Sequence, residues 1–488
     1  MTDRASILVL DEGTSSTRAA LYARDLTRGG FAQEPVALSS PEPGIVEQDP
    51  LDIWQRTRAV ALAAAGGTVP AAVAITNQRE TTILWDRATG EPVHAALVWQ
   101  DRRGAELCAA FRADGREAEL TARTGLLADP YFSGFKIAWL LEAVPGLRAR
   151  AEAGGIAFGT VDSWLIWQLT GGAVHATDAS NASRTGLFDI HQQAWSPQML
   201  AHFGIPAAIL PEVRDSAGSF GETTLFGPPV PILGVLGDQQ AALMGQGCAR
   251  PGEAKITFGT GAFLMAQTGT GPRASSARLL TTVAWRLAGV PAFAVEGAVL
   301  NAGTAVQWLR DGLGLIAASA DVNVLAASVP DAAGVHLVPA FTGLGAPHWD
   351  PDARGLISGI GRGTTAAHLA LAALEASAFQ TADLLEALVA DGVELAGLRV
   401  DGGMAASELF LQALADITGL PVMRPADLEM TALGAAKAAA LALGWITSPG
   451  DGPPAAPLEV LPARDSIWRA ARHSAWKKAV AASRAIGG

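Results

Sequence analysis

Two turns built from glycine and threonine, each flanked by apolar residues, give the chain a means of holding phosphate. The first turn contains Gly13 and Thr14, and the second spans residues 259–261, Gly-Thr-Gly. Glycine allows a turn to adopt positive φ angles and lets backbone N–H groups approach an anion closely. Each turn alone is more often an ordinary hairpin connection. Their recurrence, together with the Val-Asp-Gly-Gly run at residues 400–403, favours a phosphate cradle.

Charged residues stand on both sides of the first turn. Asp11 ends the apolar segment before the turn, where a carboxylate could hold Mg²⁺ through water. Arg18 follows the turn, and its guanidinium could neutralise a transferring phosphoryl group. The GxxxxGK(S/T) loop and the HRD and DFG signatures of protein kinases are missing from the sequence. A nucleotide would therefore have to be held by a different scaffold.

A carboxylate and an adjacent ion pair are candidates for acting on a hydroxyl acceptor. Asp238 follows the apolar run from Val230, so it should lie at the open end of a strand and could serve as a general base. Arg79 and Glu80 place a fork-shaped donor beside an acceptor-only carboxylate, which suits neighbouring hydroxyl groups. The commoner roles are a helix cap for an aspartate after a strand and a surface ion pair for Arg-Glu.

The elements that must position these residues alternate between strand and helix. Each Gly-Thr turn should join an antiparallel strand pair, over Ile7–Asp25 and Ala254–Gly269. Further strands are expected from Val69, over Thr81–Asp86, from Val230 and over Leu398–Gly403. Helices are expected over Tyr131–Leu141, Asn301–Gly314, Thr364–Ala390, from about Ala405, and over Ala470–Ala485. The return of the hairpin about half a chain later suggests a duplicated α/β architecture.

The helix expected from about Ala405 has the clearest periodicity. Its apolar residues fall on one face, at Phe410, Leu411, Leu414 and Ile417. Gly419 and Pro421 supply its stop signal. The proline- and glycine-rich segment Ser448–Pro457 is predicted to be a surface loop.

The composition is that of a folded α/β protein with two domains. The 488 residues are 49% hydrophobic and 17% charged, and they exceed the size of one ordinary core. We place the domain boundary near Gly247, which gives domains of residues 1–247 and 248–488. The net charge of −12 and the lack of a Lys/Arg block argue against a nucleic-acid partner.

Targeting and redox signals are also lacking in the sequence. The start has no long apolar region of the signal-peptide kind, and no apolar run is long enough to cross a bilayer, so we expect a cytoplasmic protein without membrane insertion. Cys108 and Cys248 are the only cysteines and lie far apart, which excludes a disulfide framework. The eight histidines fall in no HxxxH or HExxH pattern, so no protein-built zinc centre is expected.

A set of short motifs, in order from about Ile7 to Trp445, resembles the FGGY family of carbohydrate kinases. The motifs are DEGTSSTR, TNQRETTILWD, VWQDRR, DPYFSG, FGTVDSWLIWQLTGG, NASRT, GDQQAAL, FGTG, VPAFTGLGAPHW and VDGGM. Some are loose individually, but their number, order and spacing make coincidence a poor explanation. The resemblance covers nearly the whole chain.

The resemblance implies an α/β protein with two RNase-H-like domains of the actin/hexokinase ATPase type and an active-site cleft between them. It assigns the acceptor substrate and first phosphate hairpin to residues 1–247, and the second hairpin and adenosine pocket to residues 248–488. The implied reaction is ATP- and Mg²⁺-dependent phosphorylation of glycerol to sn-glycerol 3-phosphate. Alternatives are another short polyol or ketose, such as dihydroxyacetone, a tetritol or a pentulose, and more remotely a non-enzymatic actin- or chaperone-like switch.

The resemblance also implies roles for individual residues. Asp238 would be the catalytic base, and Asp11 and Asp238 would hold Mg²⁺ through water. The acceptor would contact Arg79, Glu80, Trp99, Tyr131, Asp238, Gln239 and Phe263. ATP would contact Thr14, Ser15, Arg18, Thr260, Gly303, Gln307, Gly403 and Ser407. A switch protein has no use for the acceptor set, and a sugar kinase would be expected to change several of its members.

Three positions depart from the pattern that the resemblance implies. Glu12 stands where glutamine is common, Phe135 where a small residue or threonine is common, and Ser407 where asparagine usually meets the adenine. The segment before Val230 lacks the regulatory arginine or histidine loop that relatives often carry, so control by a sugar bisphosphate or a phosphotransfer protein is not expected. A homodimer or homotetramer is common among such kinases.

Overall fold

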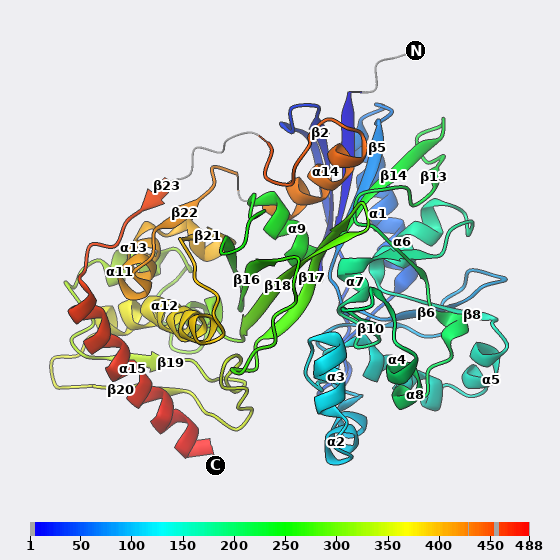
Figure 1. The fold of residues 1–488 in the computed structure, drawn as a ribbon. Helices are drawn as coiled ribbons and strands as arrows, with labels where there is room; N and C mark the ends of the chain where they lie inside the picture. Colours follow the sequence, from blue (N-terminus) through cyan, green and yellow to red (C-terminus); the bar gives the residue numbers. More distant parts are fainter. Residues whose placement is uncertain (1–4, 428, 453–457, 488) are drawn as a thin grey trace.

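The computed structural model describes residues 5–427, 429–452 and 458–487, and these residues form two lobes (Figure 1). Each lobe contains a mixed β-sheet, of six strands in the first and seven in the second. Helices pack against the sheets in both lobes (Figure 1). The predicted α/β class is confirmed.

The first sheet has the strand order β13-β14-β5-β1-β2-β3. Its strands are β1 (Ser6–Glu12), β2 (Ser16–Ala23), β3 (Arg28–Pro35), β5 (Ala72–Asn77), β13 (Glu222–Thr223) and β14 (Val230–Gly237). Strands β1, β2 and β3 are antiparallel neighbours, whereas β5 and β14 run parallel to β1. Asp11 pairs with Arg18 across the first hairpin, so both side chains lie next to its turn.

The second sheet has the strand order β17-β18-β16-β15-β21-β22-β23. Its strands are β15 (Ala254–Phe258), β16 (Ala262–Gly269), β17 (Leu280–Leu287), β18 (Val290–Val299), β21 (Leu398–Asp401), β22 (Val422–Arg424) and β23 (Leu458–Val460). Strands β15, β16 and β18 are antiparallel neighbours, and β21 and β22 run parallel to β15. The order β22-β21-β15-β16-β18 repeats the order β14-β5-β1-β2-β3. The predicted duplication is therefore confirmed.

Both faces of the first sheet are buried, which explains the continuous apolar run of β1. Successive side chains of a strand point to opposite faces. Leu8 and Leu10 pack in one core with residues of α1 (Pro50–Ala65) and α6 (Val161–Leu169). Ile7 and Val9 pack in another core with α14 (Met430–Ala442). Helix α14, from late in the chain, thus covers a sheet built by the first half (Figure 1).

Two glycines allow α14 to approach α9 (Asp238–Gly245) closely. A Cβ atom on Gly434 would lie 1.8 Å from the carbonyl oxygen of Ala241, and one on Gly245 would lie 1.9 Å from that of Met430. No side chain fits at either position, so the helix that carries Asp238 is held at backbone contact distance.

The predicted helices and strands are present, with ends shifted by a few residues. The other helices are α2 (Ala105–Ala113), α3 (Glu117–Thr124), α4 (Ser133–Ala143), α5 (Leu147–Glu152), α7 (Ala179–Ala182), α8 (Pro197–Phe203), α10 (Gly303–Asp311), α11 (Asp321–Ala326), α12 (Ala366–Ala390), α13 (Glu408–Thr418) and α15 (Ser466–Gly487). The other strands are β4 (Glu47–Gln48), β6 (Ile83–Asp86), β7 (Ala96–Leu97), β8 (Ile156–Gly159), β9 (Ala176–Asp178), β10 (Phe188–Asp189), β11 (Ala194–Trp195), β12 (Glu212–Arg214), β19 (His336–Val338) and β20 (Leu356–Ser358). Helix α13 ends at Gly419 in the left-handed conformation, as its stop signal predicts.

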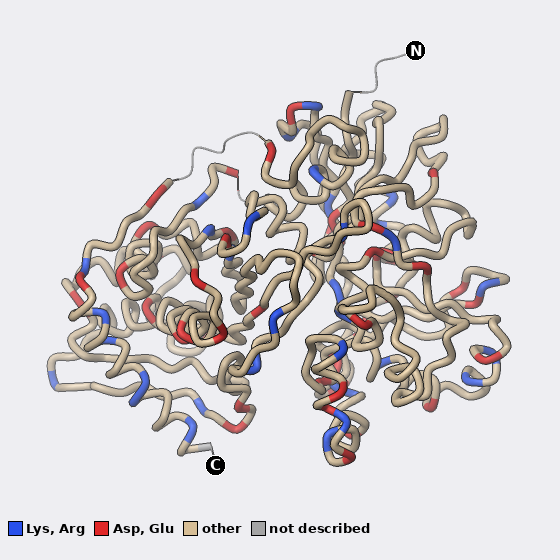
Figure 2. Tube along the Cα trace, in the orientation of Figure 1, with Lys and Arg blue, Asp and Glu red and all other residues tan. Residues whose placement is uncertain are grey.

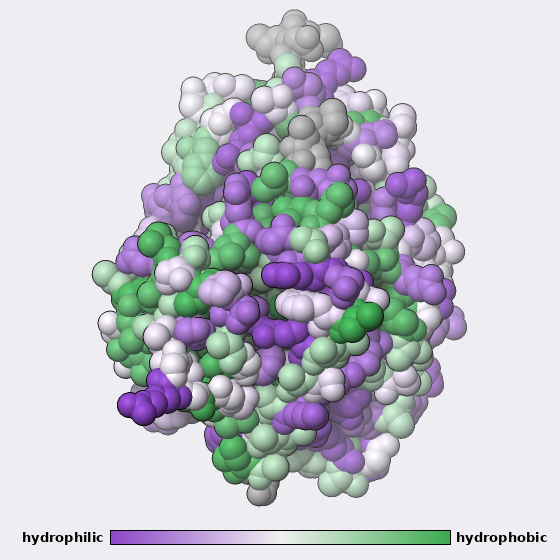
Figure 3. Space-filling model, turned by 90° about the vertical axis from the view of Figure 1, so that its left-hand side faces the viewer, coloured by the Kyte–Doolittle hydropathy of each residue, from purple (hydrophilic) through white to green (hydrophobic). Residues whose placement is uncertain are grey.

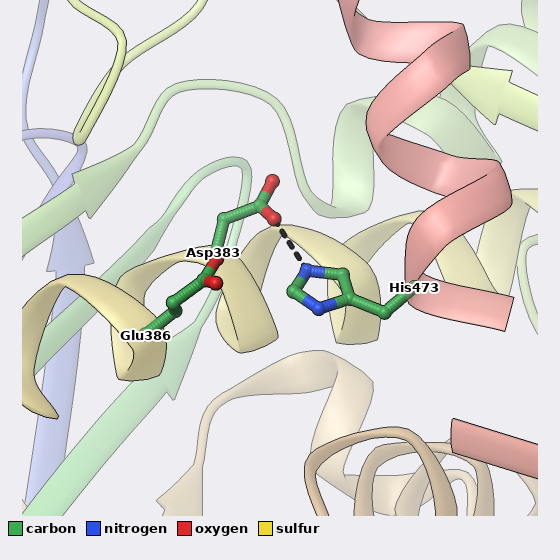
Figure 4. A group of neighbouring side chains, drawn as sticks. All are labelled: Asp383, Glu386 and His473. Atoms are coloured by element: carbon green, nitrogen blue, oxygen red, sulfur yellow. Dashed lines mark hydrogen bonds and ion pairs between the residues drawn. The ribbon is translucent and has the colours of Figure 1, made fainter. Parts of the chain in front are cut away.

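The last helix, α15, is anchored to α12 by polar side chains (Figure 4). His473 Nε2 lies 2.7 Å from one carboxylate oxygen of Asp383, and Trp476 Nε1 donates to the other oxygen at 2.8 Å. Glu386, one turn further along α12, accepts from Lys477. Since both oxygens of Asp383 have donors and Glu386 has a cation, these contacts form a structural clamp. The predicted loop Ser448–Pro457 is described only up to residue 452, and its remainder lies outside the described residues.

Charges of both signs are interspersed over the two lobes (Figure 2). Hydrophilic and hydrophobic side chains also alternate over the face of the molecule shown in Figure 3. In the described parts of the chain, no helix has both the length and the apolar character needed to cross a membrane.

Candidate active site

Arg79 is the centre of a polar group that joins the two lobes. It follows β5 and is 3% exposed. Its Nε lies 3.3 Å from Oδ1 of Asp238, and its Nη2 lies 3.5 Å from the hydroxyl of Tyr131. Its Nη1 lies 2.5 Å from Oε2 of Glu296, on β18 of the second sheet. The predicted acceptor residues Arg79, Asp238 and Tyr131 are therefore neighbours.

Glu80 has a partner that the sequence reasoning missed. Arg184 donates to Glu80 at 2.7 Å and to Glu296 at 3.0 Å, so two arginines and two glutamates form one buried network. Burial alone raises the pKa of Glu296, but Arg184 and Arg79 outweigh it and lower that pKa to about 2. Because each buried charge has a partner of opposite sign, the network offsets the desolvation free energy that a single unpaired charge would cost.

The network excludes the commoner role considered for Arg79 and Glu80, a surface ion pair. Both side chains are buried and lie 3.7 Å apart, and Glu80 also accepts from Arg184. The sequence analysis did not identify Arg184 or Glu296, although each has a recognisable sequence context. Arg184 belongs to the NASRT motif, and Glu296 is a carboxylate within an otherwise apolar strand.

Two aromatic rings connect the acceptor residues to the first phosphate turn. Trp99 and Tyr131 meet edge to face, with ring centroids 5.5 Å apart. Trp99 Nε1 donates to the Thr14 hydroxyl at 2.8 Å. Phe263, on β16, has no ring contact with either aromatic residue in the described part of the chain. Its backbone oxygen instead lies 3.5 Å from Nζ of Lys255.

Asp238 and Asp11 are carboxylates with unfavourable surroundings for two negative charges. Asp238 opens α9, and its side chain is 31% exposed. Burial raises the pKa of Asp238, although Arg79 opposes the shift. Burial also raises the pKa of Asp11 to about 7; Arg18 opposes the shift, whereas the charges of Glu429 and, to a lesser extent, Asp238 add to it. Carboxylate oxygens are the ligands that Mg²⁺ takes in proteins, and a divalent cation beside them would favour their charged forms, so the two residues are chemically suited to the predicted Mg²⁺.

The first hairpin tip presents backbone and hydroxyl groups together. Gly13 N–H donates to the Ser16 carbonyl oxygen at 3.0 Å and closes the turn. Thr14 lies at this tip and Ser15 is exposed beside it. Arg18 lies 3.7 Å from Asp11 and 3.3 Å from Glu429, so acidic groups hold the proposed phosphate-binding guanidinium next to the turn.

The second hairpin tip lies against the start of α10. Ala302 N–H donates to the Thr260 carbonyl oxygen at 2.9 Å, and Gly303 N–H donates to the Gly259 carbonyl oxygen at 3.0 Å. A Cβ on Gly303 would lie 2.6 Å from that same oxygen of Gly259, so only glycine permits this approach. Gln307 lies one turn further along α10 and is exposed.

The Val-Asp-Gly-Gly turn lies close to the second hairpin. Gly402 has a φ of 87°, and a Cβ there would lie 2.4 Å from the Phe258 carbonyl oxygen. Gly403 is exposed, and among the described residues no atom lies within 4 Å of a Cβ added there. Ser407 caps α13 by accepting the Phe410 N–H, and its hydroxyl is hydrogen-bonded to Asn323. The predicted ATP-contacting residues thus fall on the two hairpin tips and the elements beside them.

Two departures from the family pattern have physical explanations. Burial raises the pKa of Glu12 to about 8, so near neutral pH this side chain is a neutral acid similar in shape to glutamine. It accepts from the Thr57 hydroxyl at 2.9 Å, and its other oxygen has no partner in the described chain. Phe135 fills a core in which its ring contacts Phe111 and Phe203 edge to face.

Comparisons with known proteins agree with this geometry. Residues 6–245 match the N-terminal domain of the FGGY family of carbohydrate kinases, and residues 254–443 match its C-terminal domain. A glycerol kinase of Alkalilimnicola ehrlichii is 58% identical over 447 residues, 90% of each chain, and one of Methylobacterium nodulans is 53% identical over 487 residues, 97% of each chain.

Solved structures give the same result. The crystal structure of Plasmodium falciparum glycerol kinase with ADP has a TM-score of 0.92 and 33% identity, with 98% of both chains covered. A xylulose kinase of Lactobacillus acidophilus has a TM-score of 0.85 at 19% identity, with 99% of this chain and 97% of that chain covered, and shows a likeness of fold alone. Together with the two matched domains, these findings show that the chain belongs to the FGGY family of carbohydrate kinases.

Proposed function

We propose that this protein transfers the γ-phosphoryl group of ATP to glycerol and yields sn-glycerol 3-phosphate and ADP. The observation that carries the proposal is the meeting of Arg79, Asp238, Tyr131 and Trp99 in one group that reaches the first phosphate turn. Relatives that are 52–58% identical over most of their length are glycerol kinases, which supports glycerol as the acceptor.

The acceptor residues suit a short polyol. The second carboxylate oxygen of Glu80 has no hydrogen-bond donor in the described chain, so it is available to a hydroxyl group. Arg79 and Tyr131 offer further polar contacts, and the faces of Trp99 and Tyr131 suit a short carbon chain. Gln239 and Phe263 complete the proposed acceptor set.

Asp238 is the proposed general base. Its carboxylate takes the proton of the acceptor hydroxyl as that oxygen bonds to the γ-phosphorus. The bond between the γ-phosphorus and the β–γ bridging oxygen breaks, and ADP leaves with that oxygen. Arg79 Nε, 3.3 Å away, orients the carboxylate and favours its charged form.

The nucleotide would be held mainly by the two hairpin tips. Thr14, Ser15, Arg18 and Thr260 would contact the phosphates, and Gly303, Gln307, Gly403 and Ser407 would line the adenosine site. Mg²⁺, held near Asp11 and Asp238, would supply positive charge against the phosphates when bound. Water exclusion would come from closure of the lobe that contains the first sheet on the lobe that contains the second sheet.

The oligomeric state and the cellular location are proposed from the family alone. We propose a cytoplasmic enzyme that forms a homodimer or homotetramer, by analogy with its family. Light scattering during size-exclusion chromatography would measure the mass, and a monomer at micromolar concentration would contradict an oligomer.

An acceptor screen tests the proposed reaction. ATP consumption would be measured with Mg²⁺ and glycerol, dihydroxyacetone, tetritols or pentuloses. We expect glycerol to give the highest kcat/KM. No response to glycerol with robust turnover of another compound would replace glycerol as the substrate, and no response to any compound would favour the nucleotide switch.

A further inference from the structure

Lys255 is buried next to the proposed acceptor site, and the mechanism above gives it no role. It lies on β15, the first strand of the second hairpin, and its side chain is fully buried. Its Nζ donates to the side-chain oxygen of Gln239, to the Thr257 hydroxyl at 2.9 Å and to the Phe263 carbonyl oxygen at 3.5 Å. Gln239 and Phe263 both belong to the proposed acceptor set.

Other buried lysines in the described chain are held differently. Lys437 is 4% exposed, and its Nζ donates to the carbonyl oxygens of Met244 and Pro449. Lys136 likewise donates to two backbone carbonyl oxygens. Backbone oxygens are sufficient to bury an ammonium group. The side-chain contacts of Lys255 therefore call for a reason beyond burial.

The contact with Lys255 determines which way the Gln239 amide points. A lysine ammonium group can only donate hydrogen bonds, so Gln239 must present its oxygen to Lys255. The NH₂ group of Gln239 then points the other way, and it has no partner in the described chain. Burial lowers the pKa of Lys255, while the nearby carboxylates of Asp401 and Asp238 favour its charged form.

We propose that Lys255 is a positioning residue that fixes Gln239 as a hydrogen-bond donor to the acceptor hydroxyl. This inference rests on the proposed function. Asp238 can only accept when ionised, and the adjacent Gln239 is held so that it can only donate. A hydroxyl group, which both donates and accepts, fits that pair. Because Lys255 belongs to the second hairpin, it also ties the acceptor residues to a phosphate turn.

Steady-state kinetics of Lys255→Met, Gln239→Met and the double variant test the proposal. Each single variant should raise the glycerol KM by roughly ten- to a hundredfold and change the ATP KM little, because one oriented hydrogen bond to the acceptor is lost. The double variant should be no worse than the poorer single variant, since both changes remove the same interaction. Multiplied effects, or an equal rise in the ATP KM, would contradict the proposal.

Lys437→Met is the matched control, because it removes a buried ammonium group whose hydrogen bonds in the described chain all go to backbone oxygens. It should lower the thermal unfolding midpoint but leave the glycerol KM unchanged. A rise in the glycerol KM equal to that of Lys255→Met would show that any buried lysine has this effect and would overturn the proposal.

Gln239→Glu keeps the inference testable if Lys255→Met does not fold. A glutamate at this position keeps an oxygen for Lys255 but loses the NH₂ group. The glycerol KM should rise as in Gln239→Met, and an unchanged KM would contradict the proposal. The wild-type protein tests the proposed function by itself, because a lack of glycerol turnover would refute that function. The variants test the role of Lys255, and they can be measured with whichever acceptor the wild type uses.

Discussion

The ends of equivalent strands in the two sheets carry different chemistry. In the first sheet, β1 ends at Asp11 and Glu12, β5 is followed by Arg79, and β14 is followed by Asp238. In the second sheet, β15 is followed by a Gly-Thr-Gly turn and β21 by Gly402 and Gly403. The order of the five equivalent strands is the same in both sheets.

This difference agrees with the proposal that one architecture, used twice, serves two substrates. The first sheet supplies charged side chains, which a hydroxyl acceptor and its base require. In the proposed site the second sheet supplies mainly glycine-bearing turns, which let backbone groups approach a nucleotide. Its Lys255 and Glu296 also reach the acceptor residues, and the first sheet carries the Gly13-Thr14 turn. Removal of a side chain should therefore lower activity most at the strand ends of the first sheet. Addition of a methyl group should weaken nucleotide binding at the turns of the second sheet.

Asp238→Asn should have the largest effect. The amide keeps the shape of the side chain but cannot take the acceptor proton, so turnover should fall by about 10²–10⁴-fold, with much less change in glycerol binding. Steady-state kinetics and calorimetric titration with glycerol would measure the two quantities. Unchanged turnover would dismiss Asp238 as the base.

Arg79→Ala should have the next largest effect. The substitution removes the cation beside Asp238 and leaves Glu296 with Arg184 as its arginine partner. We expect a loss of roughly 2–4 kcal/mol in kcat/KM for glycerol. Slow ATP hydrolysis without glycerol should survive in the same preparation. If both activities fall equally, or neither falls, the placement of Arg79 at the acceptor is wrong.

Gly403→Ala tests the second sheet. The added methyl group lies within 4 Å of no atom in the part of the chain that the structure describes, so it should affect only a ligand that approaches Gly403. We expect the ATP KM to rise about tenfold, without a change in thermal stability. Gly271→Ala is the control, because its methyl group also has no described atom within 4 Å and lies beyond the far end of β16 from the proposed site. Equal ATP KM values in the two variants would remove Gly403 from the adenosine site.

Glu12→Gln should have the smallest effect. Since Glu12 is buried and its pKa is raised to about 8, the neutral acid and the amide are nearly equivalent near neutral pH. We expect the free energy of unfolding at pH 6.5 to change by less than about 1 kcal/mol and turnover to stay the same. Chemical denaturation would measure the first quantity. A loss of several kcal/mol would mean that Glu12 is ionised and paired in the folded protein.

The sequence predicts the strand-turn-strand units because their apolar periodicity and glycine turns are local signals. It also predicts Asp238, Arg79 and Tyr131 as acceptor residues through the family resemblance, and the structure brings these three side chains together. Their roles remain predictions.

The sequence does not reveal contacts between distant segments. Arg184 and Glu296 complete the charge network, but Arg184 lies 104 residues from Glu80 and 112 residues from Glu296 in the sequence. No local sequence pattern indicates that these side chains form a pair. Similarly, α14 carries no local signal that it covers the first sheet. The need for small residues in α14, such as Gly434, is explained only by the contact with α9 in the folded protein.

Product analysis by ³¹P NMR tests the central claim most directly. The wild-type protein would be incubated with ATP, Mg²⁺ and glycerol, and the phosphorus signals would be followed over time. The account predicts that ATP is lost in equal amount to the gain of ADP and of one phosphomonoester, glycerol 3-phosphate. Loss of ATP to ADP and inorganic phosphate alone, or no loss of ATP while another polyol is phosphorylated, would contradict it.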